Sequence, residues 1–322
     1  MKMTNRAIRC SACAVAIVAT IQLAGCASRA SESTPSYPSG IDFHSGRNRL
    51  FVSGYGDGAV RTLDPDRGSY ERLLEERKDG RQRALRVRVD VGRERLWVLD
   101  WGVVYAYDIP TRRLVRRVEL SGAILAQIHY TCLPDLALDR SGAAFVSSNA
   151  EPVLWRIDPA SFELRRYDIV PEEDRNNDFG FTGLAFAGEE GVLFGASAVM
   201  GSLWRIELGS AKARKVALSS PIRGACGLAA AHADGGRTRA PVLYVSGGFA
   251  NGLQRIAMSS DLSRGNVARV SAGDSAAVPT SLVFAKDILF LAGSQLSRHP
   301  DFGRDGGLDV TFGTVAVNPP RE

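Results

Sequence analysis

An aromatic side chain recurs at nearly constant spacing along most of this 322-residue chain. Successive members of the series are 46 to 50 residues apart, and each lies inside a short apolar run such as LFVSG, LWVLD or LYVSG. The six aromatic residues are Phe51, Trp97, Phe145, Phe194, Tyr244 and Phe290. A unit that recurs at this period is typical of a repeat architecture, in which each unit buries its apolar surface against the next.

Each run belongs to a unit of several short β-type segments separated by turn residues. A segment such as GLAF precedes the run, and a third segment follows it after a Gly- or Pro-containing turn, as in LWRID and LWRIE. A fourth follows where length allows, as in ELRRYDI and RKVAL. Four strands in such a unit form a propeller blade, which cannot bury both of its faces alone. We therefore predict an all-β fold, a six-bladed β-propeller of four-stranded antiparallel blades that begin near residues 40, 85, 133, 181, 225 and 280.

The propeller is expected to occupy residues 40–318 and to leave a tail at 319–322. The last blade has too little chain for a fourth strand, because its third strand, TVAVN, ends close to Glu322. Either that blade has three strands, or residues 30–39 supply the missing one.

The first 25 residues have the three-part layout of a secretory signal. The basic segment MKMTNRAIR precedes an apolar segment that ends at Leu23-Ala24-Gly25-Cys26, and the apolar part is short for a transmembrane helix of ~20 apolar residues. The tetrapeptide resembles a bacterial lipobox, which implies cleavage before Cys26 and acylation of that cysteine. The alternative is an ordinary cleaved signal peptide that happens to contain a cysteine.

The lipobox interpretation makes this a lipid-anchored envelope protein. More than one acyl chain is needed for stable anchoring, and a multiply acylated Cys26 meets that need. Ala27 follows the cysteine where an aspartate would favour the inner membrane, so we expect the outer membrane, facing the periplasm. Residues 26–39 then form the lipidated cysteine and a tether rich in Ser, Pro and Ala.

Charge argues against a nucleic-acid partner. The whole chain carries a formal charge of +5, but Lys2, Arg6 and Arg9 leave with the signal, and the remainder has 37 basic against 35 acidic side chains. Such a small net charge bears on solubility and does not indicate the excess of basic side chains that is typical of proteins that bind DNA or RNA.

The starts of the six inner strands should line one mouth of the central channel. The charged residues expected there are Arg86 and Asp135, from adjacent blades, and Thr182 and Cys226 stand at the equivalent positions of blades four and five. The two charges either bind a polar ligand or form a structural ion pair that plugs the channel. Asp178 belongs to an acidic loop with the D-x-N-x-D spacing of a calcium site, but it lacks the required Gly and closing Glu. That loop leads toward the same mouth, so Asp178 joins the candidate binding residues.

Two cysteines remain in the secreted part after Cys26 is acylated. Cys132 and Cys226 precede or begin inner strands of blades three and five, in an oxidising compartment. They either form a disulfide across the channel mouth or remain two buried thiols.

The segments PDLALDRSGAAFVSS (134–148), TGLAFAGEEGVLFGAS (182–197) and CGLAAA (226–231) resemble blades of the gluconolactonase and regucalcin superfamily and of NHL-type propellers. The resemblance covers roughly residues 40–317. It implies a propeller fold and, in the lactonases, a divalent cation held by Glu, Asn and Asp side chains at inner-strand starts, where oxygen ligands suit such an ion. Here Asp135 alone offers a matching group. Thr182 and Cys226 stand where that pattern has Asn or Asp, so we assign no metal ligands and no cofactor, and a divalent cation remains the alternative.

These observations favour a non-enzymatic binding module that holds a small molecule or an envelope protein. The alternative is a lactonase-like hydrolase with a degenerate metal site, using Asp135 and Asp178 around a cation. A third hypothesis is an assembly scaffold with a plugged, inert channel. Fold alone does not separate the three.

Overall fold

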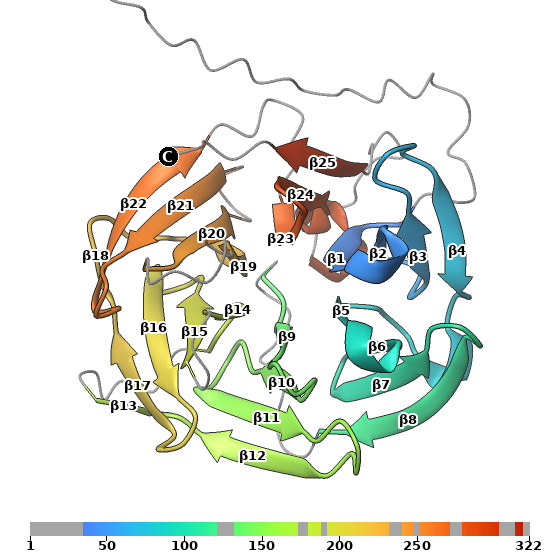
Figure 1. The fold of residues 1–322 in the computed structure, drawn as a ribbon, viewed down its shortest axis with the longest axis horizontal. Helices are drawn as coiled ribbons and strands as arrows, with labels where there is room; N and C mark the ends of the chain where they lie inside the picture. The colour runs from blue at the N-terminus through green and yellow to red at the C-terminus, as the bar shows by residue number, and fades with distance from the viewer. Residues whose placement is uncertain are drawn as a thin grey trace, which may run out of the picture.

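The computed structural model describes residues 35–120, 132–172, 180–187, 192–231, 240–247, 252–270, 279–302 and 313–317. These residues form six β-sheets arranged around a central axis (Figure 1). Apart from the strands, the described part contains turns and a few three-residue 3₁₀ helices. The predicted all-β propeller with four-stranded antiparallel blades is confirmed.

The first three sheets each contain four consecutive antiparallel strands. The strands of the first are β1 (Pro38–His44), β2 (Arg49–Gly54), β3 (Val60–Leu63) and β4 (Tyr70–Leu74). Those of the second are β5 (Arg86–Asp90), β6 (Arg95–Asp100), β7 (Val103–Asp108) and β8 (Arg113–Glu119). Those of the third are β9 (Leu136–Leu138), β10 (Ala144–Ser147), β11 (Val153–Ile157) and β12 (Leu164–Asp168).

The next two sheets add a short parallel strand at the outer edge. The fourth contains β14 (Gly183–Phe186), β15 (Val192–Ser197), β16 (Ser202–Glu207), β17 (Lys212–Lys215) and the added β13 (Val170–Pro171). The fifth contains β19 (Ala225–Ala231), β20 (Val242–Gly247), β21 (Gly252–Met258), β22 (Arg264–Val270) and the added β18 (Ala217–Leu218). In both, the chain leaving one blade pairs with the outermost strand of the next, which links neighbouring blades through backbone hydrogen bonds.

The sixth sheet has three strands within the described residues: β23 (Pro279–Ala285), β24 (Ile288–Gly293) and β25 (Gly313–Val317). Residues 35–37 form no strand, and Pro38 and Ser39 belong to β1, so they do not extend this sheet. Residues 30–34, the rest of the segment considered for a fourth strand, lie outside the described part. The first inner strand begins at Pro38, close to the predicted start near residue 40.

The repeated aromatics fill the spaces between sheets. The side chains of all six are at most 7% exposed. The apolar core is divided into clusters, and most of these combine residues of two adjacent sheets. Phe51 belongs to the same apolar cluster as Val87 and Tyr105 of the second sheet, and Phe290 to the same cluster as Ile41 and Leu50 of the first. Because the last sheet shares a cluster with the first as well as with the fifth, the described sheets close a ring. Burying one such ring contributes roughly 2–3 kcal/mol, which explains why the aromatic recurs once in every unit.

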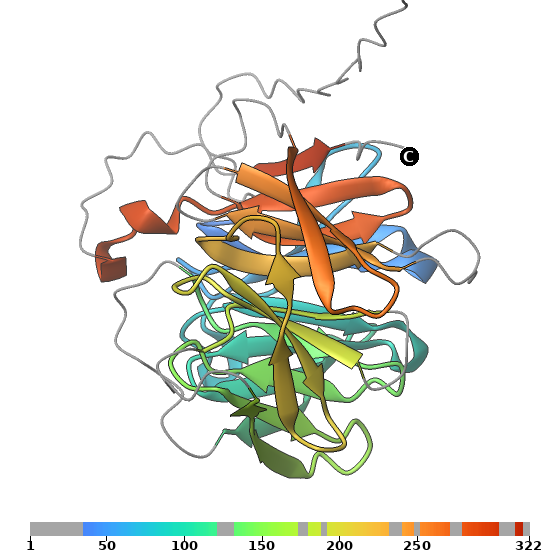
Figure 2. The same cartoon turned by 90° about the vertical axis from the view of Figure 1, so that its left-hand side faces the viewer.

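The inner strands β1, β5, β9, β14, β19 and β23 surround the axis, and each neighbours the next around the ring (Figure 1). We call the end of the molecule where these strands begin the start face, and the end where they finish the end face. Short 3₁₀ helices η1 (Ser45–Arg47) and η3 (Val91–Arg93) follow β1 and β5 at the end face. Helices η5 (Leu296–Arg298) and η6 (Pro300–Phe302) follow β24 at the start face and project from that side in Figure 2. The remaining helix, η2 (Lys78–Gly80), joins the first two sheets.

Candidate functional site

Arg86 and Asp135 meet at the start face, and of the two alternatives left open for them, a polar ligand or a structural ion pair, the structure contains the ion pair. Nε of Arg86 donates to Oδ1 of Asp135 at 3.1 Å, and neither side chain is exposed to solvent beyond 1%. Nη1 of Arg86 donates to the carbonyl of Ser39 at 2.7 Å, and Nη2 donates to that of Cys226 at 2.9 Å. The guanidinium therefore joins the first, third and fifth blades across the channel. Burial lowers the pKa of Arg86 below the ordinary arginine value, and Asp135 opposes that shift.

Asp135 has both of its carboxylate oxygens occupied. Besides Arg86, Oδ1 accepts from the backbone N–H of Leu136 at 2.8 Å and from Nη2 of Arg88 at 3.4 Å. Oδ2 accepts from the backbone N–H of Leu184 at 2.8 Å, which links the third blade to the fourth. A carboxylate bound by two guanidinium groups and two amides has little capacity left for a divalent cation. Within the described ranges, no group of three or more His, Cys, Asp or Glu side chains is placed to hold a metal ion.

Hydroxyl groups join the inner strands of neighbouring blades around the same mouth. Ser39 donates to the carbonyl of Ala84 at 2.9 Å, Ser147 to that of Phe181 at 2.7 Å, and Thr182 to that of Ala225 at 2.5 Å. Each bond pairs a buried hydroxyl with a buried carbonyl of the next blade, so neither group remains unsatisfied. Thr182, a predicted binding residue, is 4% exposed and is used in this way.

Cys226, the fourth predicted residue, forms a disulfide with Cys132. The two Cα atoms are 4.6 Å apart, and the bond connects the segment before β9 with β19. Ala198 of the intervening fourth blade packs against both cysteines. Of the two alternatives for these cysteines, the structure shows the disulfide. The start-face mouth is thus closed by a covalent bond as well as by the Arg86–Asp135 ion pair.

Asp178 lies outside the described residues, as do Asp174 and Asn176 of the same acidic loop. The binding roles given to Arg86, Asp135, Thr182 and Cys226 stay predictions. The structure shows that all four are buried and bonded to other parts of the protein, which is the arrangement of a plugged mouth.

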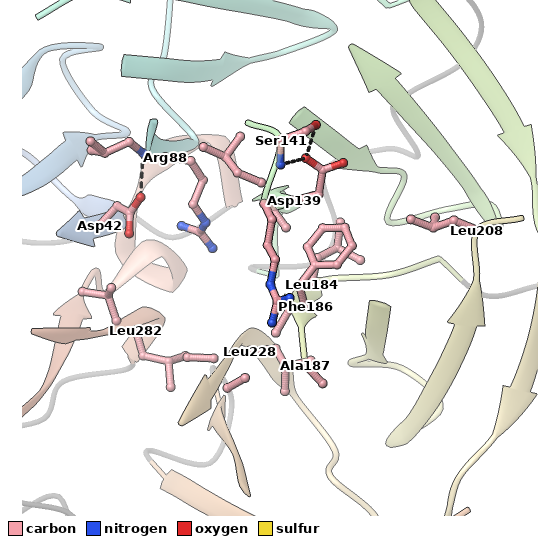
Figure 3. Close-up of a pocket in the computed structure, with 18 residues that line it drawn as sticks. Asp42, Arg88, Asp139, Ser141, Leu184, Phe186, Ala187, Leu208, Leu228 and Leu282 are labelled. Atoms are coloured by element: carbon pink, nitrogen blue, oxygen red, sulfur yellow. Dashed lines mark hydrogen bonds between the residues drawn. The ribbon is translucent and has the colours of Figure 1, made fainter. Parts of the chain in front are cut away.

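The hollow of the molecule opens at the opposite end. A pocket of about 530 Å³ lies within the ring of inner strands toward the end face (Figure 3). Its polar side is formed by Asp42 of β1 and Arg88 of β5, and its apolar side includes Leu184, Leu228 and Leu282 of β14, β19 and β23. Arg88 belongs to both ends of the channel, because its guanidinium also reaches Asp135.

Asp42 is half-buried in this pocket. Its Oδ2 accepts from the backbone N–H of Val89 at 2.6 Å, which joins the first two blades. Burial raises the pKa of Asp42 above its ordinary range, and the nearby Arg88 and the backbone N–H groups oppose that shift. A carboxylate kept partly out of water at the edge of a pocket is a common feature of ligand sites.

Sequence reasoning missed Asp42 and the end-face pocket. The signal that could have found Asp42 is its place within β1: GIDF carries a charge where the matching segments GLAF, GLAA and SLVF have alanine or valine. Burying an acidic residue inside an otherwise apolar inner strand is costly unless the carboxylate is paired, so such a residue is a candidate for a structural or functional role.

No protein-family model matches this chain, and no curated protein matches it by sequence. Solved structures do resemble it. The major allergen of Malassezia sympodialis superposes with a TM-score of 0.60 and 12% identity, over 87% of this chain and 92% of the allergen. A gluconolactonase from Xanthomonas campestris gives 0.58 and 16%, over 89% and 87%. The PQQ-bound aldose sugar dehydrogenase from Streptomyces coelicolor gives 0.60 and 14%, over 94% and 97%. At these identities the likeness shows a shared fold, and the gluconolactonase agrees with the fold that the blade resemblance implied.

Among the described residues, none of the helices has the length and apolar character needed to cross a membrane.

Proposed function

We propose that this chain is an envelope lipoprotein whose propeller is a binding module, with a small molecule seated in the end-face pocket. The observation that carries the proposal is the asymmetry of the channel. At the start face the ion pair of Arg86 and Asp135 and the Cys132–Cys226 disulfide close the mouth, whereas at the end face a hollow of about 530 Å³ remains. A concave site with mostly apolar walls and a few polar groups is the usual form of a small-molecule site.

The contacts of Asp135 argue against the lactonase-like alternative. A hydrolase of that kind needs a cation at the inner-strand starts, and the carboxylate available there already accepts from Arg86, Arg88 and two backbone N–H groups. A cation could bind Asp135 only by displacing a buried guanidinium, which would leave that positive charge unpaired.

Metal analysis of the purified soluble domain, residues 27–322, tests this choice. We expect no stoichiometric calcium, zinc or manganese, no hydrolysis of a panel of lactones, and a small molecule retained in native mass spectrometry. Stoichiometric metal that is lost in both Asp135→Asn and Asp135→Ala, together with lactone hydrolysis by the wild-type domain, would overturn the binding-module proposal in favour of the enzyme.

The lipid anchor is the second part of the proposal. Its support is the sequence Leu23-Ala24-Gly25-Cys26 after a basic and apolar leader; these residues lie outside the described part. Cys26→Ser removes the thiol that is proposed to take the first lipid, so the variant should appear in the soluble periplasmic fraction while the wild type sediments with outer membranes. Unchanged fractionation of the variant would contradict the anchor.

We also assign the three-stranded sheet as the sixth blade of the propeller. Two observations support this assignment. β23 neighbours both β19 and β1, and apolar residues of its sheet belong to the clusters shared with both adjacent sheets.

A further inference from the structure

The end-face pocket has a polar edge and an apolar wall on different blades. Asp42 and Arg88 come from the first two blades, whereas Leu184, Leu228 and Leu282 come from the fourth, fifth and sixth (Figure 3). A molecule that fills the pocket therefore meets hydrogen-bonding groups on one side and leucine side chains on the other. Only a ligand that is itself polar at one edge and apolar over its body matches both sides.

The charges around the pocket cancel. Its charged lining residues are Asp42, Arg88, Asp139 and Arg140, two acids and two bases. Any ionised ligand would meet a like charge as well as an opposite one, and it would lose water on entering a pocket with apolar walls. A neutral ligand carries neither cost.

Most of the polar capacity at this edge is already used by the protein. Nη1 of Arg88 donates to the carbonyls of Val87 at 2.9 Å and Ile41 at 3.3 Å, and Nη2 donates to Asp135. Oδ1 of Asp139 accepts from the backbone N–H groups of Ser141 and Ala143 and from the Ser141 hydroxyl, which holds the turn between β9 and β10.

Asp42 differs from these groups. The backbone N–H of Val89 donates to Oδ2, and the backbone N–H of Phe43 also donates to this carboxylate. Among the residues that the structure describes, no side chain forms a hydrogen bond with it. A carboxylate oxygen accepts hydrogen bonds and, when ionised, cannot donate one. The ligand must therefore supply the donor.

We propose that the end-face pocket binds a neutral, amphipathic small molecule with a compact apolar body and a hydroxyl group that donates to Asp42. This inference rests on the proposed binding function and narrows it to a chemical class. The apolar body lies against Leu184, Leu228 and Leu282, and the hydroxyl points toward the first two blades. A volume of about 530 Å³ is within the usual range of small-molecule pockets, and it accommodates a mono- or polycyclic alcohol.

Matched pairs of probes test the hydrogen bond. Borneol, menthol and cedrol are compact cyclic alcohols, and the methyl ether of each keeps the body but cannot donate. Binding to the purified domain is measured by ligand-observed NMR titration. We expect at least one alcohol to bind about tenfold to a hundredfold more tightly than its ether, because a hydrogen bond to an ionised acceptor is among the stronger ones. Menthylamine, a cation, and menthane carboxylate, an anion, should both bind more weakly than menthol.

Three variants locate the site. Asp42→Asn keeps an oxygen for the Val89 N–H but presents an amide donor to the ligand, so the advantage of alcohol over ether should disappear. Ala230→Leu adds bulk at a half-buried position of the pocket lining and should weaken the binding of alcohols and of ethers to the same extent. Asp100→Asn is the matched control, because Asp100 is also a buried carboxylate that accepts from backbone N–H groups but lies at the start face; it should change neither.

The outcomes separate this inference from the function on which it rests. If alcohols and ethers bind equally, or if menthylamine binds best, the ligand class is wrong while the pocket remains a binding site. If binding is insensitive to Ala230→Leu, the pocket assignment is wrong. If none of the probes binds while native mass spectrometry shows another molecule in the domain, the binding module survives and the class proposed here is overturned.

Discussion

A guanidinium with no access to water stays charged only when acceptors surround it. Arg86 has a carboxylate and three backbone carbonyls within 3.1 Å. Its three partners outside its own blade are Asp135, Ser39 and Cys226, and each of them belongs to a different blade. Through these contacts Arg86 links the second blade to the first, third and fifth. Replacing a well-surrounded buried ion pair by apolar groups can be neutral, whereas removing one partner leaves an uncompensated charge.

Arg86→Met should therefore destabilise the protein strongly. The variant leaves Asp135 in a buried site with only Arg88 and backbone N–H groups as partners, and we expect a loss of about 3–5 kcal/mol in the free energy of unfolding. Urea denaturation measures it. Arg113→Met, at an exposed position of β8, is the control and should change stability by less than about 0.5 kcal/mol. Equal effects at the two sites would show that the buried pair is not a structural lock.

The ionised carboxylate of Asp42 should lower the free energy of unfolding at neutral pH. Its pKa is raised in the folded protein by burial, so folding disfavours the ionised form. The cost is absent below the unfolded-state pKa of about 4, and it grows as the pH rises toward the folded pKa. Asp42→Asn should therefore raise the melting temperature at pH 7, and the gain should vanish in acid.

Asp108→Asn supplies the comparison of opposite sign. Hydrogen bonds from Thr111 lower the pKa of Asp108, so its ionised form is favoured by folding and its neutralisation should lower the melting temperature at pH 7. Melting curves of both variants and the wild type from pH 3 to 8 make the test. A gain in Asp108→Asn, or none in Asp42→Asn, would contradict the assigned causes.

At the scale of elements, the recurring aromatics were enough to predict the sheets, because an inner apolar strand and its buried ring must recur in every blade. The position between sheets admits mainly large apolar side chains, which is why the aromatic is a reliable marker of each unit. Examples are Phe51, Trp97 and Tyr244. The added parallel strands β13 and β18 were not predicted. They are two residues long and are defined by pairing with another blade, which no local pattern records.

The site was predicted less completely than the fold. Alignment of the units placed Arg86 and Asp135 at one mouth but left open whether they bind each other or a ligand, and the structure shows the ion pair. Which end of the channel is open depends on how far the Arg86 side chain reaches and on what it bonds to, and this is a property of packing in three dimensions. Asp42 lies only three residues beyond Ser39, yet it belongs to the other end of the channel.

The disulfide joins elements from blades three and five and should stabilise the ring. Cys132 and Cys226 are 94 residues apart in sequence, so the bond restricts a long loop of the unfolded chain, an effect of about 2–4 kcal/mol. The double variant Cys132→Ala/Cys226→Ala should lose that amount in urea denaturation. Dithiothreitol should lower the stability of the wild-type domain to the level of the variant and leave the variant unchanged.

A thiol count distinguishes failure of this prediction from failure of the bond itself. The domain of residues 27–322 contains no other cysteine, so it should show no free thiol before reduction and two afterward. Two free thiols in the oxidised domain would contradict the disulfide.

At the scale of the whole molecule, the two faces of the ring differ in kind. The start face is closed by bonds that cross the axis, and the end face keeps a pocket that Asp42 and Arg88 help to line (Figure 3). A ring joined at one face can hold a pocket at the other without relying on ligand to keep its blades together. Rigidity at the start face then positions Arg88, which contacts Asp135 below and lines the pocket above.

Ring closure makes the end of the chain essential to the whole. β25 (Gly313–Val317) is the third strand of the last sheet and pairs with β24 along its length, while β23 of the same sheet neighbours β1 at the start of the propeller. Deleting residues 313–322 removes that strand and leaves the edge of β24 unpaired, next to the cluster that Phe290 forms with Ile41 and Leu50. We expect the truncated domain to be insoluble or to melt at least about 10 °C lower, since each kcal/mol lost shifts the melting temperature by about 2–4 °C in a domain of this size. Deleting residues 319–322 alone should leave melting unchanged, which controls for loss of the terminus as such. If the longer deletion melts like the wild type, the last sheet does not close the ring, and the sixth blade assigned here is not part of the cooperative fold.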